Sequence, residues 1–142
     1  MRDIVIDASV AAKWFLDEPH STEALDILKK VLDDELSLLA PDHIYAEIGN
    51  TLWKRTNAGT IVVSDAQDFI SDFLRIKITL VSTADLLSDA YHLAIKYKRS
   101  VYDSLYLALS QREQCQFVTA DEKLVNAVGP ALSNVVLLAN WS

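Results

Sequence analysis

The sequence predicts an α/β fold in which a parallel β-sheet is covered by helices on both faces. Five short apolar runs alternate with segments whose apolar residues recur every three or four positions, as on one face of a helix. Short apolar strands separated by helices are typical of parallel sheets that are buried on both sides. The 142 residues include only three glycines and three prolines, which favours one domain over residues 1–142 with short loops.

The first part of the chain predicts one strand and two helices. Residues 3–7 (DIVID) form a short apolar run rich in β-branched residues, which is the first expected strand. Residues 8–16 follow directly as a short helix. Pro19 and Ser21 then open a longer helix, whose apolar stripe covers residues 24–32 at spacings of three and four.

The middle of the chain predicts a strand followed by two helices. Residues 36–41 (LSLLAP) are the second strand, and a helix with an apolar stripe over residues 44–52 starts near Asp42. Gly59 suits the position just past the end of this helix, where a left-handed backbone is common. Ser64 and Gln67 have the spacing of a capping box, which predicts the start of the following helix.

The last part of the chain supplies three strands and three helices. Residues 77–81 (KITLV) are the third strand, and a helix starting at residues 82–85 runs through Tyr97. The next helix begins near Val101 or Tyr102 and is apolar on nearly every side, which is typical of a buried helix. Residues 115–119 (CQFVT) and 134–138 (NVVLL) are the fourth and fifth strands, with a short helix over residues 121–128 between them.

Composition excludes several classes of protein and site. A net charge of −7 argues against broad, sequence-independent nucleic-acid binding, although a nuclease with a metal site remains open. The single cysteine, Cys115, excludes an intrachain disulfide and a thiolate zinc site. His20, His43 and His92 show no ligand spacing, so we expect them at the surface or at helix ends. Without an apolar run long enough for a membrane span or signal peptide, we expect a cytoplasmic protein.

Two aspartates stand at the carboxyl ends of predicted strands. Asp7 ends the first strand, and Asp121 comes two residues after the fourth, each just before a helix. Both therefore suit helix N-caps, for which aspartate is among the best residues. They also lie where parallel α/β sheets bind ligands, beyond the carboxyl ends of the strands.

Two further acids lie on predicted helices. Glu47 flanks the apolar stripe of its helix, and Asn50 and Thr51 share its face. Asp103 lies near the start of the apolar helix, where capping is the simpler interpretation. In a parallel α/β fold these helices can face the edge that holds Asp7 and Asp121.

Four carboxylates that converge repel one another unless a cation neutralises them. Oxygen ligands without cysteine or histidine suit Mg²⁺ or Mn²⁺, and such ions support phosphoryl chemistry by activating water. The four acids together therefore indicate a metal-dependent site more strongly than any one of them does.

The chain resembles the PIN-domain ribonucleases, of the kind that serve as the toxin in VapBC toxin–antitoxin pairs. The resemblance rests on four segments in order, IVIDASV, AEIGNTLWK, YDSLYLALS and FVTADEKL, and covers nearly the whole chain. It implies a three-layer α/β/α sandwich around a five-stranded, mainly parallel sheet. It also implies Mg²⁺- or Mn²⁺-dependent hydrolysis of single-stranded RNA, a cognate antitoxin as partner, and a homodimer, which the apolar share of 51% also favours.

Carried onto this sequence, the resemblance assigns an acidic quartet and three supporting polar residues. The quartet is Asp7, Glu47, Asp103 and Asp121, and the supporting residues are Ser9, Asn50 and Thr119. We expect the three aspartates to hold the metal, and Glu47 to bind a second ion or to orient the attacking water. Ser9 and Thr119 are expected either to fix carboxylate rotamers or simply to cap helices.

Basic and aromatic residues complete the expected site. Candidates for RNA phosphates are Lys54, Arg55, Lys98 and Arg99, with a solvated surface as the alternative interpretation. Trp14, Trp53 and Tyr102 suit base stacking or, more simply, packing in the core or an interface.

Two other functions fit the same residues. One is a haloacid-dehalogenase-like phosphatase with Asp7 as nucleophile, although Ser9 stands where that chemistry needs a second aspartate. The other is an interaction module whose metal site has lost its activity.

Overall fold

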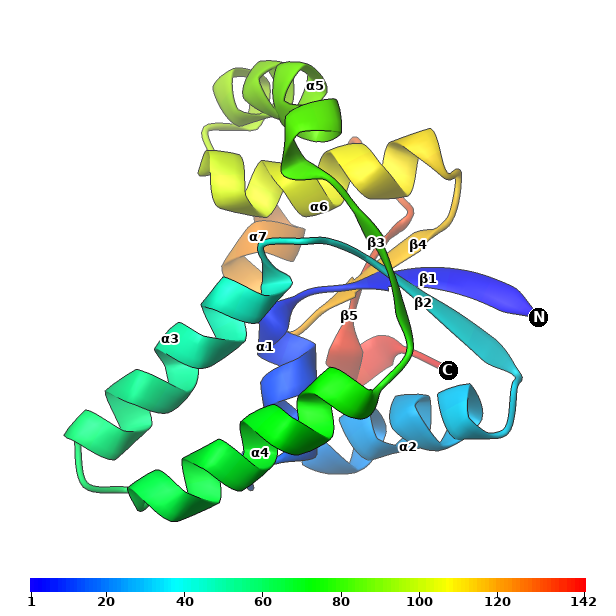
Figure 1. Cartoon of the computed structure of the whole chain (residues 1–142). Helices are drawn as coiled ribbons and strands as arrows, with labels where there is room; N and C mark the ends of the chain where they lie inside the picture. Colours follow the sequence, from blue (N-terminus) through cyan, green and yellow to red (C-terminus); the bar gives the residue numbers. More distant parts are fainter.

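A five-stranded sheet with every neighbouring pair parallel forms the centre of the protein. The computed structural model describes all residues, Met1–Ser142. The strands are β1 (Arg2–Ile6), β2 (Leu36–Pro41), β3 (Ile78–Val81), β4 (Gln116–Thr119) and β5 (Val135–Leu137). Their order across the sheet is β3-β2-β1-β4-β5, so the chain starts in the central strand (Figure 1).

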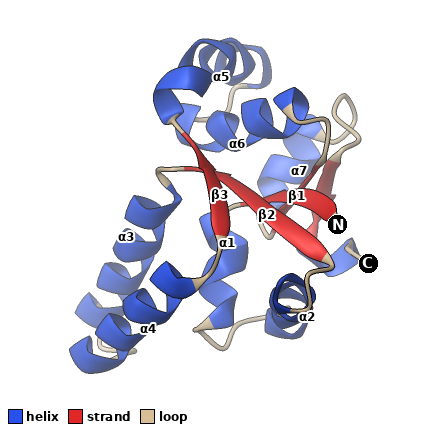
Figure 2. Ribbon diagram, turned by 45° about the vertical axis from the view of Figure 1, so that its right-hand side comes forward, coloured by secondary structure: helices blue, strands red, loops and turns tan.

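Helices cover both faces of this sheet, which confirms the three-layer α/β/α sandwich. The helices are α1 (Ala8–Ala11), α2 (Ser21–Leu32), α3 (Ile44–Asn57), α4 (Val63–Arg75), α5 (Thr83–Tyr97), α6 (Val101–Arg112) and α7 (Glu122–Val128). Helices α5 and α6 lie on one face, and α1 and α2 lie on the other (Figure 1). Helices α3 and α4 form an antiparallel pair that extends beyond the sheet (Figures 1 and 2). None of the helices combines the length and apolarity needed to cross a membrane.

The core explains why the second half of β1 and the middle of α6 are mostly apolar. Ile4, Val5 and Ile6 are fully buried in the central strand. In α6 every residue from Ser104 to Ser110 is buried, because the helix packs on the sheet with one side and on α5 with another. The prediction of a buried helix over this segment is therefore confirmed.

Several predicted element ends are confirmed. Gly59 has a left-handed backbone with φ of 78° just past the end of α3, as expected for a residue without a Cβ. Ser82 is the N-cap of α5, its hydroxyl accepting a hydrogen bond from the amide of Ala84, and α5 ends at Tyr97.

Two predicted local features are wrong. Ser64 does not cap α4, because Val62 is the N-cap, two residues before Ser64, and no side chain caps the helix. The expected helix over residues 8–16 is broken into α1 and a 3₁₀ turn over Ala12–Trp14. The indole nitrogen of Trp14 donates to the carbonyl of Ala24 at 2.8 Å, so Trp14 is a core residue that anchors this turn to α2.

Candidate active site

One pocket at the carboxyl edge of β1 and β4 brings the four predicted acids together. Its volume is about 290 Å³. The residues that line it are Asp7, Ala8, Ser9, Glu47, Asn50, Thr51, Lys54, Asp103, Tyr106 and Asp121. They come from the start of α1, from α3, from the first half of α6 and from the residue before α7. Sequence positions more than a hundred residues apart thus meet where β1 and β4 end.

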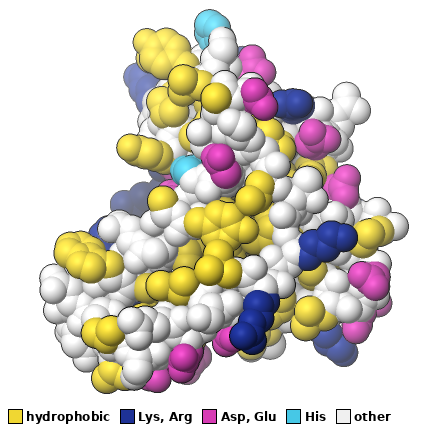
Figure 3. Space-filling model, in the orientation of Figure 1, with side chains coloured by type: hydrophobic (Ala, Val, Ile, Leu, Met, Phe, Trp, Pro, Cys, Tyr) yellow, Lys and Arg dark blue, Asp and Glu magenta, His cyan; other side chains and the backbone are white.

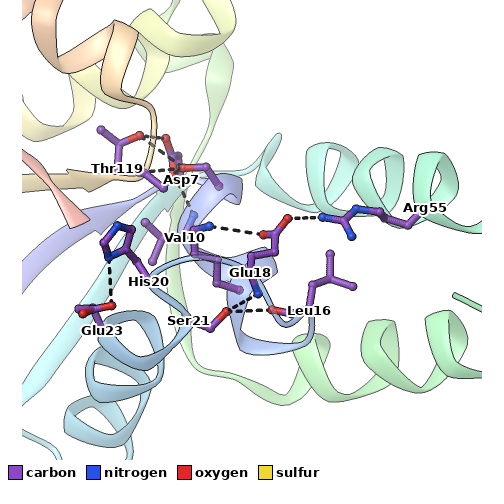
Figure 4. Close-up of polar contacts among 12 residues, drawn as sticks. Asp7, Val10, Leu16, Glu18, His20, Ser21, Glu23, Arg55 and Thr119 are labelled. Carbon is purple, nitrogen blue, oxygen red and sulfur yellow. Dashed lines mark hydrogen bonds and ion pairs between the residues drawn. The ribbon is translucent and has the colours of Figure 1, made fainter. Parts of the chain in front are cut away.

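Asp7 is the most buried of these acids and is held on both oxygens. Its side chain is 8% exposed. Oδ1 accepts hydrogen bonds from the Ser9 hydroxyl at 2.5 Å and from the Val10 amide at 3.3 Å, and Oδ2 accepts from the Thr119 hydroxyl at 2.5 Å (Figure 4). Burial outweighs these hydrogen bonds and raises the pKa of Asp7 to about 6, with a smaller contribution from the charge of Glu47. Asp7 is therefore the N-cap of α1 and also a carboxylate whose charged form is destabilised by burial.

Asp121 is joined to Asp7 through Thr119. Oδ1 of Asp121 accepts from the Leu124 amide at 3.1 Å, which makes it the N-cap of α7. Its own amide donates to the Thr119 hydroxyl at 3.1 Å, and this hydroxyl donates to Asp7. Thr119 therefore orients one carboxylate with its hydrogen and the backbone of another with its lone pair.

Asp103 does not cap its helix, so the simpler interpretation of this residue is wrong. The N-cap of α6 is Ser100, whose hydroxyl accepts from the Asp103 amide at 3.0 Å. The Asp103 carboxylate lies 3.8 Å from Nη2 of Arg99. Burial, and then the charge of Asp121, raise the pKa of Asp103, and Arg99 opposes the shift. Asp103 and Asp121 therefore repel each other in the pocket, and a capping role does not explain why Asp103 is there.

Glu47 lies against two residues that were not predicted to belong to the site, and one of them holds it by a hydrogen bond. The hydroxyl of Tyr106 donates to Oε1 of Glu47 at 2.5 Å, and Nε2 of His43 lies 3.4 Å from the same oxygen. Burial, and next the charge of Glu47, raise the pKa of the Tyr106 phenol, so its hydroxyl stays a donor. The only signal for Tyr106 in the sequence is a polar-tipped ring within an otherwise apolar helix. His43 lies at the start of α3, as expected for a helix-end histidine.

The four predicted basic residues are not gathered at the pocket. Lys54 lines it, and Arg99 lies beside Asp103. The Arg55 guanidinium instead forms an ion pair with Glu18 in the loop before α2 (Figure 4). Lys98 is exposed at the end of α5 with a left-handed backbone.

Of the three aromatic candidates for base stacking, two are at the surface. Trp53 and Tyr102 are 61% and 66% exposed, whereas Trp14 is buried in the core. Only Trp53 and Tyr102 are therefore accessible to a base.

The donor atoms of the pocket suit a hard divalent cation. All four acids offer oxygen, and the mutual repulsion of Asp103 and Asp121 is the kind of charge that a cation relieves. No three of the acidic, histidine or cysteine side chains already stand at ligand separation. An ion at this pocket therefore needs water molecules or side-chain movement to complete its coordination.

Comparisons with known proteins agree with this architecture. The chain is 29% identical over 133 residues to ribonuclease VapC3 of Pyrobaculum aerophilum, which covers 91% of this chain and 96% of the relative. Among solved structures, PAE2754 of Pyrobaculum aerophilum superposes with a TM-score of 0.71 at 19% identity, covering 97% of this chain and 92% of that one. A toxin–antitoxin complex from Klebsiella pneumoniae contains a chain with a TM-score of 0.64 at 12% identity, covering 95% of this chain and 97% of that one.

The sequence model of the PIN domain matches residues 4–129, from the central strand through α7, the helix that follows Asp121. Because this match covers most of the chain and all four acids, the chain belongs to the PIN domain family.

Proposed function

We propose that residues 1–142 form a single nuclease domain that hydrolyses phosphodiester bonds of single-stranded RNA with Mg²⁺ or Mn²⁺, as the toxin of a toxin–antitoxin pair. The observation that carries the proposal is the convergence of Asp7, Glu47, Asp103 and Asp121 on one pocket. The likeness to ribonuclease VapC3 over nearly the whole chain supports RNA as the substrate.

The proposed chemistry is attack of water on the phosphorus atom, followed by loss of the sugar oxygen. When bound, the metal activates water and neutralises charge on the phosphate. Asp7, Asp103 and Asp121 are the residues proposed to hold it. Ser9 and Thr119 fix the rotamer of Asp7 by donating to both of its oxygens. Glu47 binds a second ion or orients the water.

Polar residues around the acids have supporting roles in this proposal. Asn50 and Lys54 line the pocket and face the phosphate backbone. Arg99 is a second candidate for phosphate contact, in exchange for its ion pair with Asp103. Lys98 is exposed near the same end of α5, while Arg55 is engaged by Glu18 and contributes only if that pair opens.

Protein partners belong to the same proposal. Large apolar residues are exposed on several helices, including Leu74 on α4 and Leu87 and Ile95 on α5, at 61%, 53% and 65%. Apolar side chains also gather over the middle of the face that carries α3, α4 and β3 (Figure 3). Such surface is typical of protein interaction sites. This surface supports binding of a cognate antitoxin and formation of a homodimer. The cytoplasm is the proposed location of the protein.

A phosphatase that uses Asp7 as nucleophile fits the site less well. Both oxygens of Asp7 accept hydrogen bonds from buried or partly buried donors, which weakens either of them as a nucleophile. Ser9, two residues on, donates to Asp7 and offers no carboxylic acid for protonating a leaving group. An interaction module without activity would not need four acids in one pocket, since their repulsion only destabilises it.

The test is cleavage of a fluorogenic single-stranded RNA by the purified chain, with Mn²⁺ and with EDTA. We expect cleavage only with Mn²⁺, and we expect Asp7→Asn and Asp103→Asn to abolish it while circular dichroism remains unchanged. The amide keeps the shape of each side chain and removes the anionic ligand. Full activity in either variant would remove that residue from the site, and cleavage in EDTA would overturn the metal requirement.

A further inference from the structure

Tyr106 is placed to control one acid of the pocket from inside the core. Its side chain is 2% exposed, and its ring stacks on Phe117 of β4 with centroids 5.6 Å apart. The ring of His43 packs on it at 4.8 Å. Packed between these two rings, Tyr106 places its hydroxyl 2.5 Å from Oε1 of Glu47.

His43 packs on Tyr106 and lies beside the same oxygen. Its Nε2 lies 3.1 Å from the carbonyl oxygen of Tyr102 and 3.4 Å from Oε1 of Glu47. The Tyr102 carbonyl can only accept, so Nε2 carries a hydrogen and donates it to that carbonyl. His43 Nδ1 is buried without a hydrogen-bond partner, which leaves Nε2 as the only ring atom with a polar role.

The two oxygens of Glu47 are therefore unequal. Oε1 accepts a hydrogen bond from Tyr106 and lies 3.4 Å from Nε2 of His43, whereas no protein group donates to Oε2. We propose that Tyr106 is a positioning residue, with His43 as its support, that fixes Oε1 of Glu47 and so presents Oε2 to the pocket. This inference rests on the proposed nuclease function and assigns a role to a residue outside the acidic quartet.

Fixing one oxygen has a mechanistic consequence. A carboxylate on a long side chain loses much rotational freedom when it binds a metal or orients a water, and a buried hydrogen bond removes that freedom beforehand. Groups that hold metal-binding carboxylates in this way typically affect metal affinity or activity without touching the substrate. Tyr106 should therefore act on Mn²⁺ binding or on kcat, and leave KM for RNA unchanged.

The experiment compares Tyr106→Phe with Tyr45→Phe in the full chain. Tyr106→Phe keeps the ring and its stacking and removes only the hydroxyl. Tyr45 lies on the same helix as Glu47 and packs its ring on Phe73, and its hydroxyl makes no hydrogen bond to the site, so it is the matched control. The readouts are Mn²⁺ affinity by calorimetry, kcat and KM on the fluorogenic RNA, and the melting temperature.

For Tyr106→Phe we expect a loss of roughly 10- to 100-fold in Mn²⁺ affinity, in kcat at saturating Mn²⁺, or in both, with KM unchanged. In a Glu47→Gln background the same substitution should have no further effect on Mn²⁺ affinity, because the two residues act as a unit. A chain that cleaves RNA equally well with Tyr106→Phe and binds Mn²⁺ equally tightly overturns the inference alone. An equal loss in Tyr45→Phe, or an undiminished effect of Tyr106→Phe in the Glu47→Gln background, also overturns it. A wild type that does not cleave RNA overturns the proposed function, and the inference with it.

Discussion

The acidic pocket has two sides that hold their carboxylates differently. The strand side consists of Asp7, Ser9, Thr119 and Asp121, and the helix side consists of Glu47, Asp103 and Tyr106. On the strand side, Asp7 is 8% exposed and accepts hydrogen bonds on both oxygens. On the helix side, the Glu47 side chain is 34% exposed and is held by one oxygen. The strand side thus carries the larger desolvation cost, and the helix side keeps an oxygen free.

The difference in burial predicts a difference in pH dependence. Folding raises the pKa of Asp7 from 3.8 to about 6, so between these values the folded state holds a proton that the unfolded state has lost. In the absence of metal, Asp7 therefore destabilises the protein as the pH rises from 4 to 6. The full penalty, about 3 kcal/mol, is present above pH 6.

The largest predicted effect is therefore a stabilisation by Asp7→Asn in EDTA. We compare the free energy of unfolding of the variant with that of the wild type at two pH values. This difference should favour the variant by about 3 kcal/mol more at pH 8 than at pH 3.5. Asparagine caps a helix about as well as aspartate, so the substitution isolates the charge. Urea unfolding of both proteins at several pH values measures this. If the difference in unfolding free energy between the two proteins stays constant from pH 3.5 to 8, burial does not destabilise the charged form of Asp7.

Asp103→Asn provides the comparison from the helix side. Its carboxylate is 31% exposed and lies near Arg99, so solvent and the ion pair relieve part of the repulsion from Asp121. The same unfolding series should show a change in the same direction that is smaller than the change for Asp7→Asn. A larger change for Asp103→Asn than for Asp7→Asn would show that the helix side carries the larger desolvation cost.

Metal should reverse the order of the wild type and Asp7→Asn. A ligand at a hundredfold excess over its Kd stabilises the folded state by about 2.7 kcal/mol. We expect the wild type to gain this from Mn²⁺ and Asp7→Asn to gain much less. Thermal melts of both proteins with EDTA and with Mn²⁺ give the four values. If Mn²⁺ stabilises both equally, or neither, Asp7 is not a metal ligand.

The two sides also differ in how far they follow from sequence. Asp7 and Asp121 were predictable because each follows a strand of a parallel sheet, and strand ends share one edge. The pairing of Glu47 with Tyr106 spans 59 residues and has no local pattern, so only the packing of α6 against α3 reveals it. A distant contact also decides the position of Arg55. The sequence made it a candidate for RNA phosphates, and in the structure its guanidinium forms an ion pair with Glu18 in the loop before α2.

Helix ends follow the same division between local and distant causes. The start of α5 within residues 82–85 and the left-handed Gly59 after α3 depend on backbone geometry within a few residues, and both were predicted correctly. The cap predicted at Ser64 is wrong because α4 starts two residues earlier than this cap requires, with Val62 at the N-cap position. The acids themselves remained ambiguous, since Asp7 and Asp121 are caps whether or not they bind metal.

Hydrogen bonds on the strand side should contribute measurably to stability. Thr119→Val keeps the shape of a fully buried residue, removes the hydroxyl that donates to Asp7 and leaves the Asp121 amide without its acceptor. A hydrogen bond to a charged group contributes roughly 1.5–3 kcal/mol, so at pH 8 in EDTA we expect a loss of about 2 kcal/mol. In an Asp7→Asn background, Thr119→Val should lower the unfolding free energy by less than it does in the wild type, because the charged acceptor is absent. Equal losses in both backgrounds would show that the hydroxyl stabilises something other than Asp7.

The smallest effect is expected for the ion pair on the helix side. Arg99 and Asp103 are 3.8 Å apart and partly exposed, and pairs of this kind typically contribute about 0–1 kcal/mol. Arg99→Gln should therefore change the unfolding free energy by less than about 1 kcal/mol, and added salt should shrink the difference. Arg112→Gln, which removes the exposed pair with Glu113, is the matched control for loss of an arginine from α6 and its flank. Since Arg99 also lowers the pKa of Asp103, its removal in EDTA should increase the stabilising effect of Asp103→Asn. If Arg99→Gln costs as much as Thr119→Val, the helix side is held as firmly as the strand side, and the distinction between them fails.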